Sequence, residues 1–392
     1  MRKAFAKLAS KVDNLESGSG STQTTSSRAP EDEATKSGPK AIYPQPGQRE
    51  PGPGQLPPKV ASATHHGKMR FFHPDGHEHI VSRDVGNSGV LDGKVVWGWG
   101  DTLMGAGGRN SKANICATDS TSIGNLSNPM CSTDTALWDN NEFVANFVPC
   151  LPHEEADGGL VHYAFGASNV IEYAPNQGLI FFLKIHRPDG KNHIQGAGVA
   201  RVHMEGRSKP ICTRDTETLW TREEPCYGDV GIAYDSRDGY VYAFGKGPQE
   251  DDEQLIRRTY LCRAPIEKAV DGDVGSFQYW DQRVRNWTPQ RLTSHGMMGT
   301  AKLTYEMAIF DYLAVDRSAP FWSNWFNKWM FLYGDSWGYS DVYVMMADVS
   351  FCFVFYLPTY PPPYDVPRSF LFFLRLRRRG ESKRTYLPTY LL

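Results

Sequence analysis

The sequence predicts an all-β domain built from repeated strand units, and a β-propeller is the architecture that fits it best. No stretch of the central chain shows long helical periodicity. Short apolar or alternating runs occur instead, each introduced by a turn that carries Gly, Asp or Asn. Similar runs recur about 60 to 90 residues apart, a spacing typical of radial blades. A β-sandwich, which also needs short strands and turns, remains the alternative.

Four of these runs share one pattern: a turn, then a strand of β-branched and aromatic residues, then a small or polar residue at the exit. They are Asp92–Asp101, Gln177–Lys184, Asp238–Lys246 and Asn327–Asp335. Candidate partner strands lie nearby, at His162–Phe165 and Ala200–Met204. The pattern therefore predicts four blade-forming units with room for further strands between them.

Composition divides the chain into three parts. Residues 1–67 are an arm and lead-in rich in Ser, Thr, Gly, Pro and charge, which we expect to be disordered because it offers little apolar surface to bury. Residues 68–349 form the predicted propeller domain. Residues 350–392 break the pattern, with Pro runs, an Arg cluster and the repeated words Tyr356–Tyr360 and Tyr386–Tyr390. We expect an irregular tail there, and our hypothesis is that it is translated non-coding sequence left by mis-splicing.

Charge and hydropathy narrow the function classes. A formal net charge of -2 and the lack of a basic stripe argue against nucleic-acid binding. No stretch approaches the ~18 apolar residues of a membrane span, and the N-terminus lacks the apolar core of a secretory signal. A cytoplasmic location is the default expectation, with secretion by another route left open. Seven scattered Cys show no metal-type spacing, and they suit either free thiols or incidental bridges.

The clearest chemical signal is a pair of acids around the first run. Asp84 lies in a Gly/Ser-rich turn, and Asp101 ends the strand in the word Gly100-Asp101-Thr102. The fourth run ends in the similar word Gly334-Asp335-Ser336. A Gly before the Asp keeps the neighbouring surface low, so a carboxylate at a strand end can face a ligand in a central channel. The structural alternative is that each Asp caps its own turn.

Further candidates lie at comparable strand edges. Asp229 precedes the third run, and Glu306 lies in an apolar segment that we expect to be a strand, where burial would raise its pKa unless a basic partner is present. Trp337 and Tyr339 follow Asp335 and are candidates for stacking on a ligand. The His-rich lead-in, His153 and the His186 and His193 pair read as solvated surface, so we predict no metal site. No phosphate-binding or dinucleotide motif occurs, and we expect no cofactor.

The Asp84 turn, the word Trp97-Gly-Trp-Gly-Asp-Thr102 and the later word Phe331-Leu-Tyr-Gly-Asp-Ser-Trp337 resemble a family of propellers long catalogued only as a domain of unknown function. Some bacterial and phage members of that family are endo-D-arabinanases acting on arabinofuranose polymers. The resemblance covers about residues 80 to 348. It implies a five-bladed propeller and hydrolysis by a carboxylate pair, with Asp84 and Asp101 matching the first-blade acids.

The leading hypothesis is therefore a glycoside hydrolase that cleaves a polysaccharide, arabinofuranose polymers among the candidates, with Asp84 and Asp101 as the catalytic acids. Asp229, Glu306 and Asp335 would orient sugar hydroxyls, and Trp337 and Tyr339 would stack on the sugar. The alternative is a non-catalytic propeller that binds carbohydrate or protein on the same face. The sequence leaves open the substrate, the stereochemical outcome and the oligomeric state.

Overall fold

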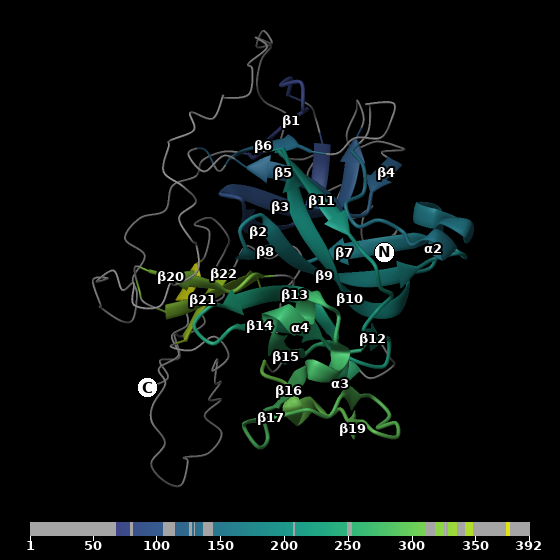
Figure 1. Ribbon diagram of the computed structural model, residues 1–392, viewed down its shortest axis with the longest axis vertical. Coiled ribbons are helices and arrows are strands. Elements are labelled where there is room, and N and C mark those ends of the chain that lie inside the picture. The colour runs from purple at the N-terminus through teal and green to yellow at the C-terminus, as the bar shows by residue number, and fades with distance from the viewer. Residues whose placement is uncertain are drawn as a thin grey trace, which may run out of the picture.

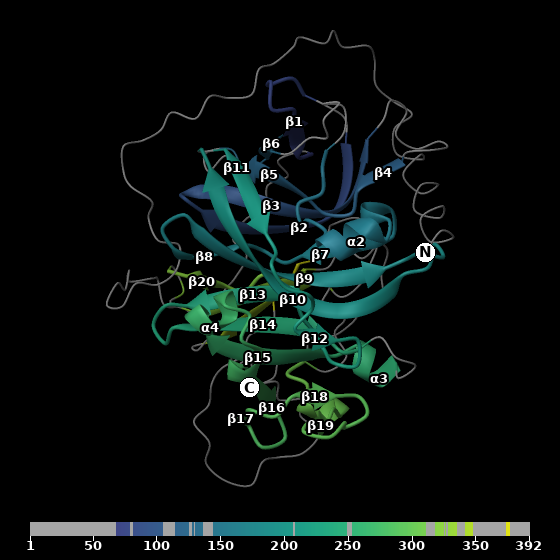
Figure 2. The same cartoon turned by 45° about the vertical axis from the view of Figure 1, so that its right-hand side comes forward.

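The computed structural model describes residues 68–78, 81–104, 114–124, 128, 130–135, 144–206, 208–248, 253–310, 318–324, 326, 328–334, 342–347 and 374–376. They form a mostly β molecule in a propeller-like arrangement of four sheets, which we call blades 1 to 4 (Figures 1 and 2). The predicted fold class is thus confirmed at this coarser level. The arm at 1–67 lies outside the described residues.

Blade 1 has the order β1-β6-β5-β3-β2, with β4 also paired to β3. Its β2–β3 hairpin turns at Asp92-Gly93, where Asp92 has φ 51° and Gly93 φ 71°, so the first of the four repeated runs is the strand predicted from the sequence. Bounds are β1 Arg70–Phe72, β2 Val81–Leu91, β3 Lys94–Met104, β4 Asn114–Ala117, β5 Ser120–Gly124 and β6 Cys131–Asp134.

Blade 2 has the order β11-β10-β9-β7, with β8 on β9 and β12 on β10. The second run is its central strand β9, and both predicted partner strands are present, in β7 and β10. Bounds are α2 Pro152–Ala156, η2 Gly159–Val161, β7 Tyr163–Ala167, β8 Ile171–Ala174, β9 Gln177–His186, β10 His193–Glu205, β11 Lys209–Thr213 and β12 Trp220–Thr221.

Blade 3 has the order β13-β14-β15-β16-β17, and the third run is β14. A separate parallel pair, β18-β19, follows it. Bounds are β13 Cys226–Asp235, β14 Tyr240–Lys246, α3 Glu253–Ile256, β15 Thr259–Pro265, α4 Ile266–Val270, η3 Val274–Ser276, β16 Gln278–Asp281, β17 Asn286–Thr288, β18 Leu292–Thr293, β19 Ala301–Lys302 and η4 Tyr305–Met307.

Blade 4 has the order β20-β21-β22-β23, and the fourth run is β21. Three residues of the C-terminal tail, residues 350–392, form β23. This strand pairs with β22 and therefore belongs to blade 4. The rest of the tail lies outside the described residues. Bounds are β20 Phe321–Ser323, β21 Lys328–Gly334, β22 Val342–Ala347 and β23 Leu374–Leu376.

The apolar runs of the central strands are continuous because each strand is buried on both faces. Successive residues of a strand project to opposite faces. Leu179 and Phe181 of β9 therefore pack towards blade 3, whereas Ile180 and Phe182 pack towards blade 1. In β14 the odd-numbered side chains join blade 2 and the even-numbered ones join blade 4. Three hydrophobic clusters thus fill the three interfaces between successive blades.

Hydrogen bonds link the inner edges of the blades in chain order. Asn87 of β2 donates to the carbonyl of Ala167 over 3.4 Å. Asn169 exchanges two bonds of 2.9 Å with the backbone of Ile232 in β13. The Ser318 amide then donates to Val230 over 2.7 Å.

Gly231 of blade 3 packs closely against the segment that leads into blade 4. A Cβ on Gly231 would overlap the carbonyl oxygen of Ser318 and lie 3.2 Å from the Cα of Ala319. We expect Gly231→Ala to lower the free energy of unfolding by about 1–3 kcal/mol, because backbone on the facing blade must move. Gly275→Ala is the matched control, since its Cβ would meet only Asp273 Oδ1, at 3.4 Å. Urea unfolding curves compare the two; equal stability of both variants would contradict the close packing.

Candidate functional site

Asp84 and Asp101 face each other across a bulge in the β2–β3 hairpin. The register pairs Arg83 with Thr102 and then Val85 with Trp99, so Asp84 alone stands opposite Gly100 and Asp101. Side-chain alternation from the Arg83–Thr102 pair places both acids on the other face of the sheet. Both are half-buried. Bulges commonly re-aim side chains next to binding and catalytic sites.

Gly100 is the residue that lets the two acids approach. A Cβ at this position would overlap Oδ1 of Asp84 and lie 2.9 Å from Cγ2 of Val85. Oδ1 of Asp84 is itself shielded from solvent. The missing side chain of Gly100 therefore leaves space for the Asp84 carboxylate.

The backbone is strained at Val85, the residue that follows Asp84. Val85 has φ 63° and Gly86 has φ 117°, and Val85 is 41% exposed. A left-handed conformation is a true outlier for a β-branched residue and costs on the order of 1–3 kcal/mol. A Cβ on Gly86 would lie 2.9 Å from the ring of Trp99. Such strain is found where the surrounding structure holds a functional geometry.

The opposite face of the hairpin is fixed by buried polar contacts. Arg83 donates to Asp134 of β6 over 2.6 Å, and both side chains are buried. The guanidinium lies 4.6 Å from the ring centre of Phe71 and 5.5 Å from that of Trp99. Thr102 shares a 3.0 Å hydrogen bond with Ser120. The strands that carry the two acids are thus held rigidly from behind.

Asp229 occupies the corresponding place in blade 3. It lies in a bulge of β13, between the pairs Tyr227–Gly245 and Gly231–Phe244, and its Oδ2 is 4.0 Å from Nζ of Lys246. Asp84 and Asp229 each precede by three residues a residue that hydrogen-bonds to a neighbouring blade. The side chain of Asp229 is 10% exposed.

The expectation that Glu306 lies in a strand and has a raised pKa is wrong. It lies in the 3₁₀ turn η4 rather than in a strand, and its side chain is exposed. Hydrogen bonding with Thr304, more than any other cause, lowers the pKa of Glu306 instead of raising it. The turn buries Met307 and leaves Glu306 outside. Asp335, Trp337 and Tyr339 lie outside the described residues.

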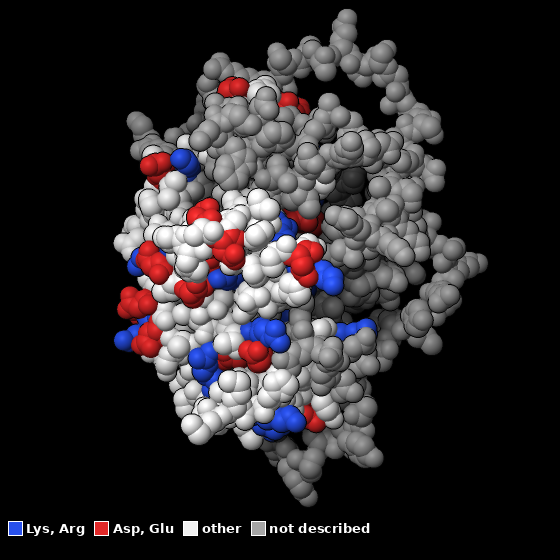
Figure 3. All heavy atoms as spheres, turned by 90° about the vertical axis from the view of Figure 1, so that its right-hand side faces the viewer, with Lys and Arg blue, Asp and Glu red and all other residues white. Residues whose placement is uncertain are grey.

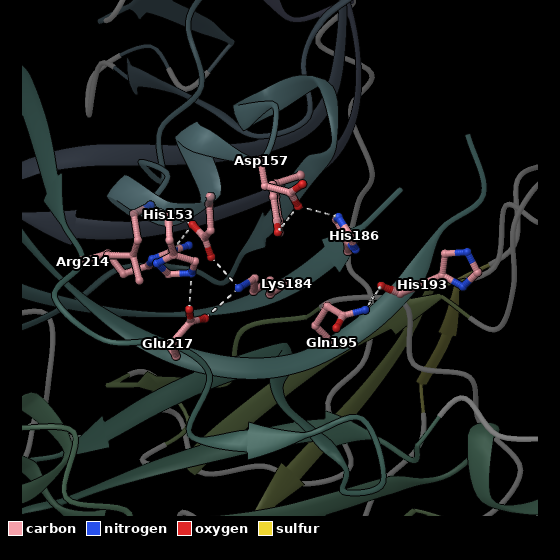
Figure 4. A network of polar contacts seen from close by, with 11 residues as sticks. His153, Asp157, Lys184, His186, His193, Gln195, Arg214 and Glu217 are labelled. Carbon is pink, nitrogen blue, oxygen red and sulfur yellow. Dashed lines mark hydrogen bonds and ion pairs between the residues drawn. The ribbon is translucent and has the colours of Figure 1, made fainter. Parts of the chain in front are cut away.

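Sequence reasoning missed a buried charge network in blade 2 (Figure 4). Glu154 is fully buried in α2, with Lys184 Nζ 2.5 Å from its Oε1 and Arg214 bonded to its Oε2. Lys184 also reaches Glu217 Oε2 at 2.6 Å, and Glu217 pairs with His153. The sequence feature that could have predicted this network is Lys184, a charged residue in an otherwise apolar strand. The solvated surface expected around His153 does not extend to Glu154, which is buried.

Three groups of side chains bring possible metal ligands together: His73, Asp75 and His77; Asp157, His162 and His186; His153, Glu154 and Glu217. The expected solvated setting holds for His193, whose side chain is 50% exposed, but not for His186, which is 26% exposed and stacked on Tyr163.

Five described cysteines are free thiols. Among the described residues, every helix is too short or too polar to traverse a lipid bilayer.

Basic and acidic side chains alternate over the described part of the face seen in Figure 3. No patch of a single sign dominates that view. Comparison of the chain with protein-family models and with curated proteins found no match.

Proposed function

We propose that this protein is a glycoside hydrolase in which Asp84 and Asp101 are the catalytic carboxylates. The observation that carries the proposal is the bulge that sets Asp84 against Gly100 and Asp101 on the innermost hairpin of blade 1. One acid would protonate the leaving glycosidic oxygen, and the other would attack the anomeric carbon or activate water. The first and last strand motifs resemble the propeller family that contains endo-D-arabinanases. This resemblance supports a polysaccharide substrate, with arabinofuranose polymers as the first candidates.

The carboxylate pair also bears on stereochemistry. The distance between the two carboxyl groups decides the outcome: about 5–5.5 Å in retaining enzymes and about 6.5–9.5 Å in inverting ones. The anomer released first, read by NMR, distinguishes the two mechanisms.

The rest of the ring would hold the sugar. Asp229, whose Oδ2 lies 4.0 Å from Nζ of Lys246, is proposed to accept hydrogen bonds from sugar hydroxyls. Glu306, Asp335, Trp337 and Tyr339 keep the substrate-binding roles inferred from the sequence as proposals. We further propose that the complete ring has five blades, which requires one more set of strands than the four described sheets supply.

The direct test is release of reducing ends from a panel of polysaccharides, including arabinans, by the full-length chain. The double variant Asp84→Asn/Asp101→Asn serves as the blank. We expect cleavage of at least one polymer by the wild type and none by the blank. Binding of a glycan without cleavage by either protein would replace the hydrolase by a carbohydrate-binding propeller.

Gly100→Ala tests the fit of the pair without touching either acid. The added Cβ would displace the Asp84 carboxylate, and a misplacement of about 1 Å can cost on the order of 100-fold in rate. We expect kcat/KM on the cleaved polymer to fall by about that factor. Gly98→Ala is the matched control in the same strand, because its Cβ would make only an ordinary 3.5 Å contact with Ser168. Equal activity of the two variants would contradict the assigned geometry.

A further inference from the structure

Two histidines and a carboxylate converge beside the charge network of blade 2. Asp157 follows α2, His162 follows η2, and His186 ends β9. One ligand atom from each lies within 4.8 Å of those from the other two. Oδ2 of Asp157 and Nε2 of His186 are already 3.1 Å apart. Ligands held about 2.1 Å from a tetrahedral zinc ion lie about 3.4 Å from one another, so this pair already has metal-binding spacing.

The hydrogen bonds around the three residues prepare them as ligands. Nδ1 of His162 is 2.5 Å from the backbone carbonyl oxygen of Asp157, which can only accept, so Nδ1 carries the proton. In the neutral ring, Nε2 of His162 then keeps its lone pair. An imidazole that donates its other N–H to a backbone carbonyl is the usual arrangement around bound metal.

Tyr163 holds the other two ligands. Its hydroxyl donates to Oδ2 of Asp157 over 2.8 Å, and its ring stacks on His186 with centres 4.6 Å apart. Tyr163 thus orients a carboxylate ligand and an imidazole ligand at once.

The two other groups are poorer candidates. In the group of His153, Glu154 and Glu217, the carboxylates are already paired with Lys184 and Arg214, whose charges would oppose a cation. In the turn of His73, Asp75 and His77, both Nδ1 atoms already contact the same Asp75 oxygen. Two of its three side chains, Asp75 and His77, are 57% and 60% exposed, whereas in the other group Asp157 is 54% and His186 26% exposed.

We propose that Asp157, His162 and His186 form a Zn²⁺-binding site with one coordination position open to solvent or ligand. Two imidazoles and one carboxylate suit zinc, which keeps a fourth position open in sites with three protein ligands. Zn²⁺ would replace the hydrogen bond between Asp157 and His186. His162 directly precedes β7.

The test is isothermal titration of the EDTA-treated, dialysed full-length chain with ZnCl₂. We expect one ion bound per chain, with affinity reduced at least tenfold in His162→Gln and in His186→Gln. Tyr163→Phe should weaken binding about 10- to 100-fold, the usual effect of removing a partner of a ligand. His193→Gln, in the same β9–β10 hairpin, should bind as the wild type does. Circular dichroism melting without metal shows that each variant is folded.

Co²⁺ substitution gives a readout that does not depend on affinity. Visible absorption of the Co²⁺-loaded wild type should have the intensity of four-coordinate cobalt, and the bands should disappear in Asp157→Asn. Absence of zinc binding by the wild type would overturn the proposal. So would unchanged binding in both histidine variants, or loss of binding in a His73→Gln/His77→Gln double variant.

Discussion

Asp101→Asn is expected to abolish hydrolysis while leaving the fold intact. The amide is isosteric with the carboxylate but can neither give up a proton to the leaving oxygen nor act as nucleophile or base. Loss of a general acid or base typically costs about 10²–10⁴-fold in rate. Because the change removes transition-state chemistry rather than ground-state contacts, kcat should fall with little change in KM.

Asp92→Asn is the matched control for this variant. Asp92 lies at the far end of the same hairpin with φ 51°, a conformation that Asn adopts readily, and its backbone amide still donates to Glu172. Initial rates on the cleaved polymer, with a melting curve for each protein, separate activity from stability. Full activity of Asp101→Asn would remove Asp101 from the mechanism.

The second large effect is on stability: Glu154→Gln should lower the free energy of unfolding by about 3–5 kcal/mol. The substitution leaves Arg214 buried beside a neutral amide, with Lys184 held only by Glu217. Removing one partner of a buried ion pair is far more costly than removing an exposed one. Glu155→Gln, an exposed neighbour in the same helix, should change the free energy by less than about 0.5 kcal/mol.

The difference in the free energy of unfolding between the wild type and Glu154→Gln should depend on pH. Burial raises the pKa of Glu154, but hydrogen bonds from Lys184, the Leu151 amide and Arg214 outweigh it, and the net pKa lies below the usual 4.5. A pKa lowered in the folded state gives stability that is complete above the unfolded value and lost as pH falls through the folded value. Urea unfolding at pH values from about 7 downwards should therefore show the gap between wild type and Glu154→Gln closing only below about pH 4.5. A gap independent of pH would contradict the charge-based explanation.

The fold class could be predicted because strands buried on both faces require continuous apolar runs, and these are visible in Gln177–Lys184 and Asp238–Lys246. The role of Gly100 in leaving room for Asp84 was not predicted, because it depends on how β2 pairs with β3. The prediction that Glu306 lies in a strand was wrong because an apolar segment can form a 3₁₀ turn as well as a strand. Residues such as Glu154 and Arg214 lie 60 positions apart, and only the blade geometry brings them together.

The most direct test of the account is a crystal structure of Asp101→Asn with an uncleaved oligosaccharide of the substrate polymer. The account predicts the sugar at the Asp84 end of the ring. The scissile glycosidic oxygen should lie within hydrogen-bonding distance of Asp84 or the Asn introduced at position 101. A sugar bound at another surface, with both side chains out of reach of its glycosidic bonds, would contradict it.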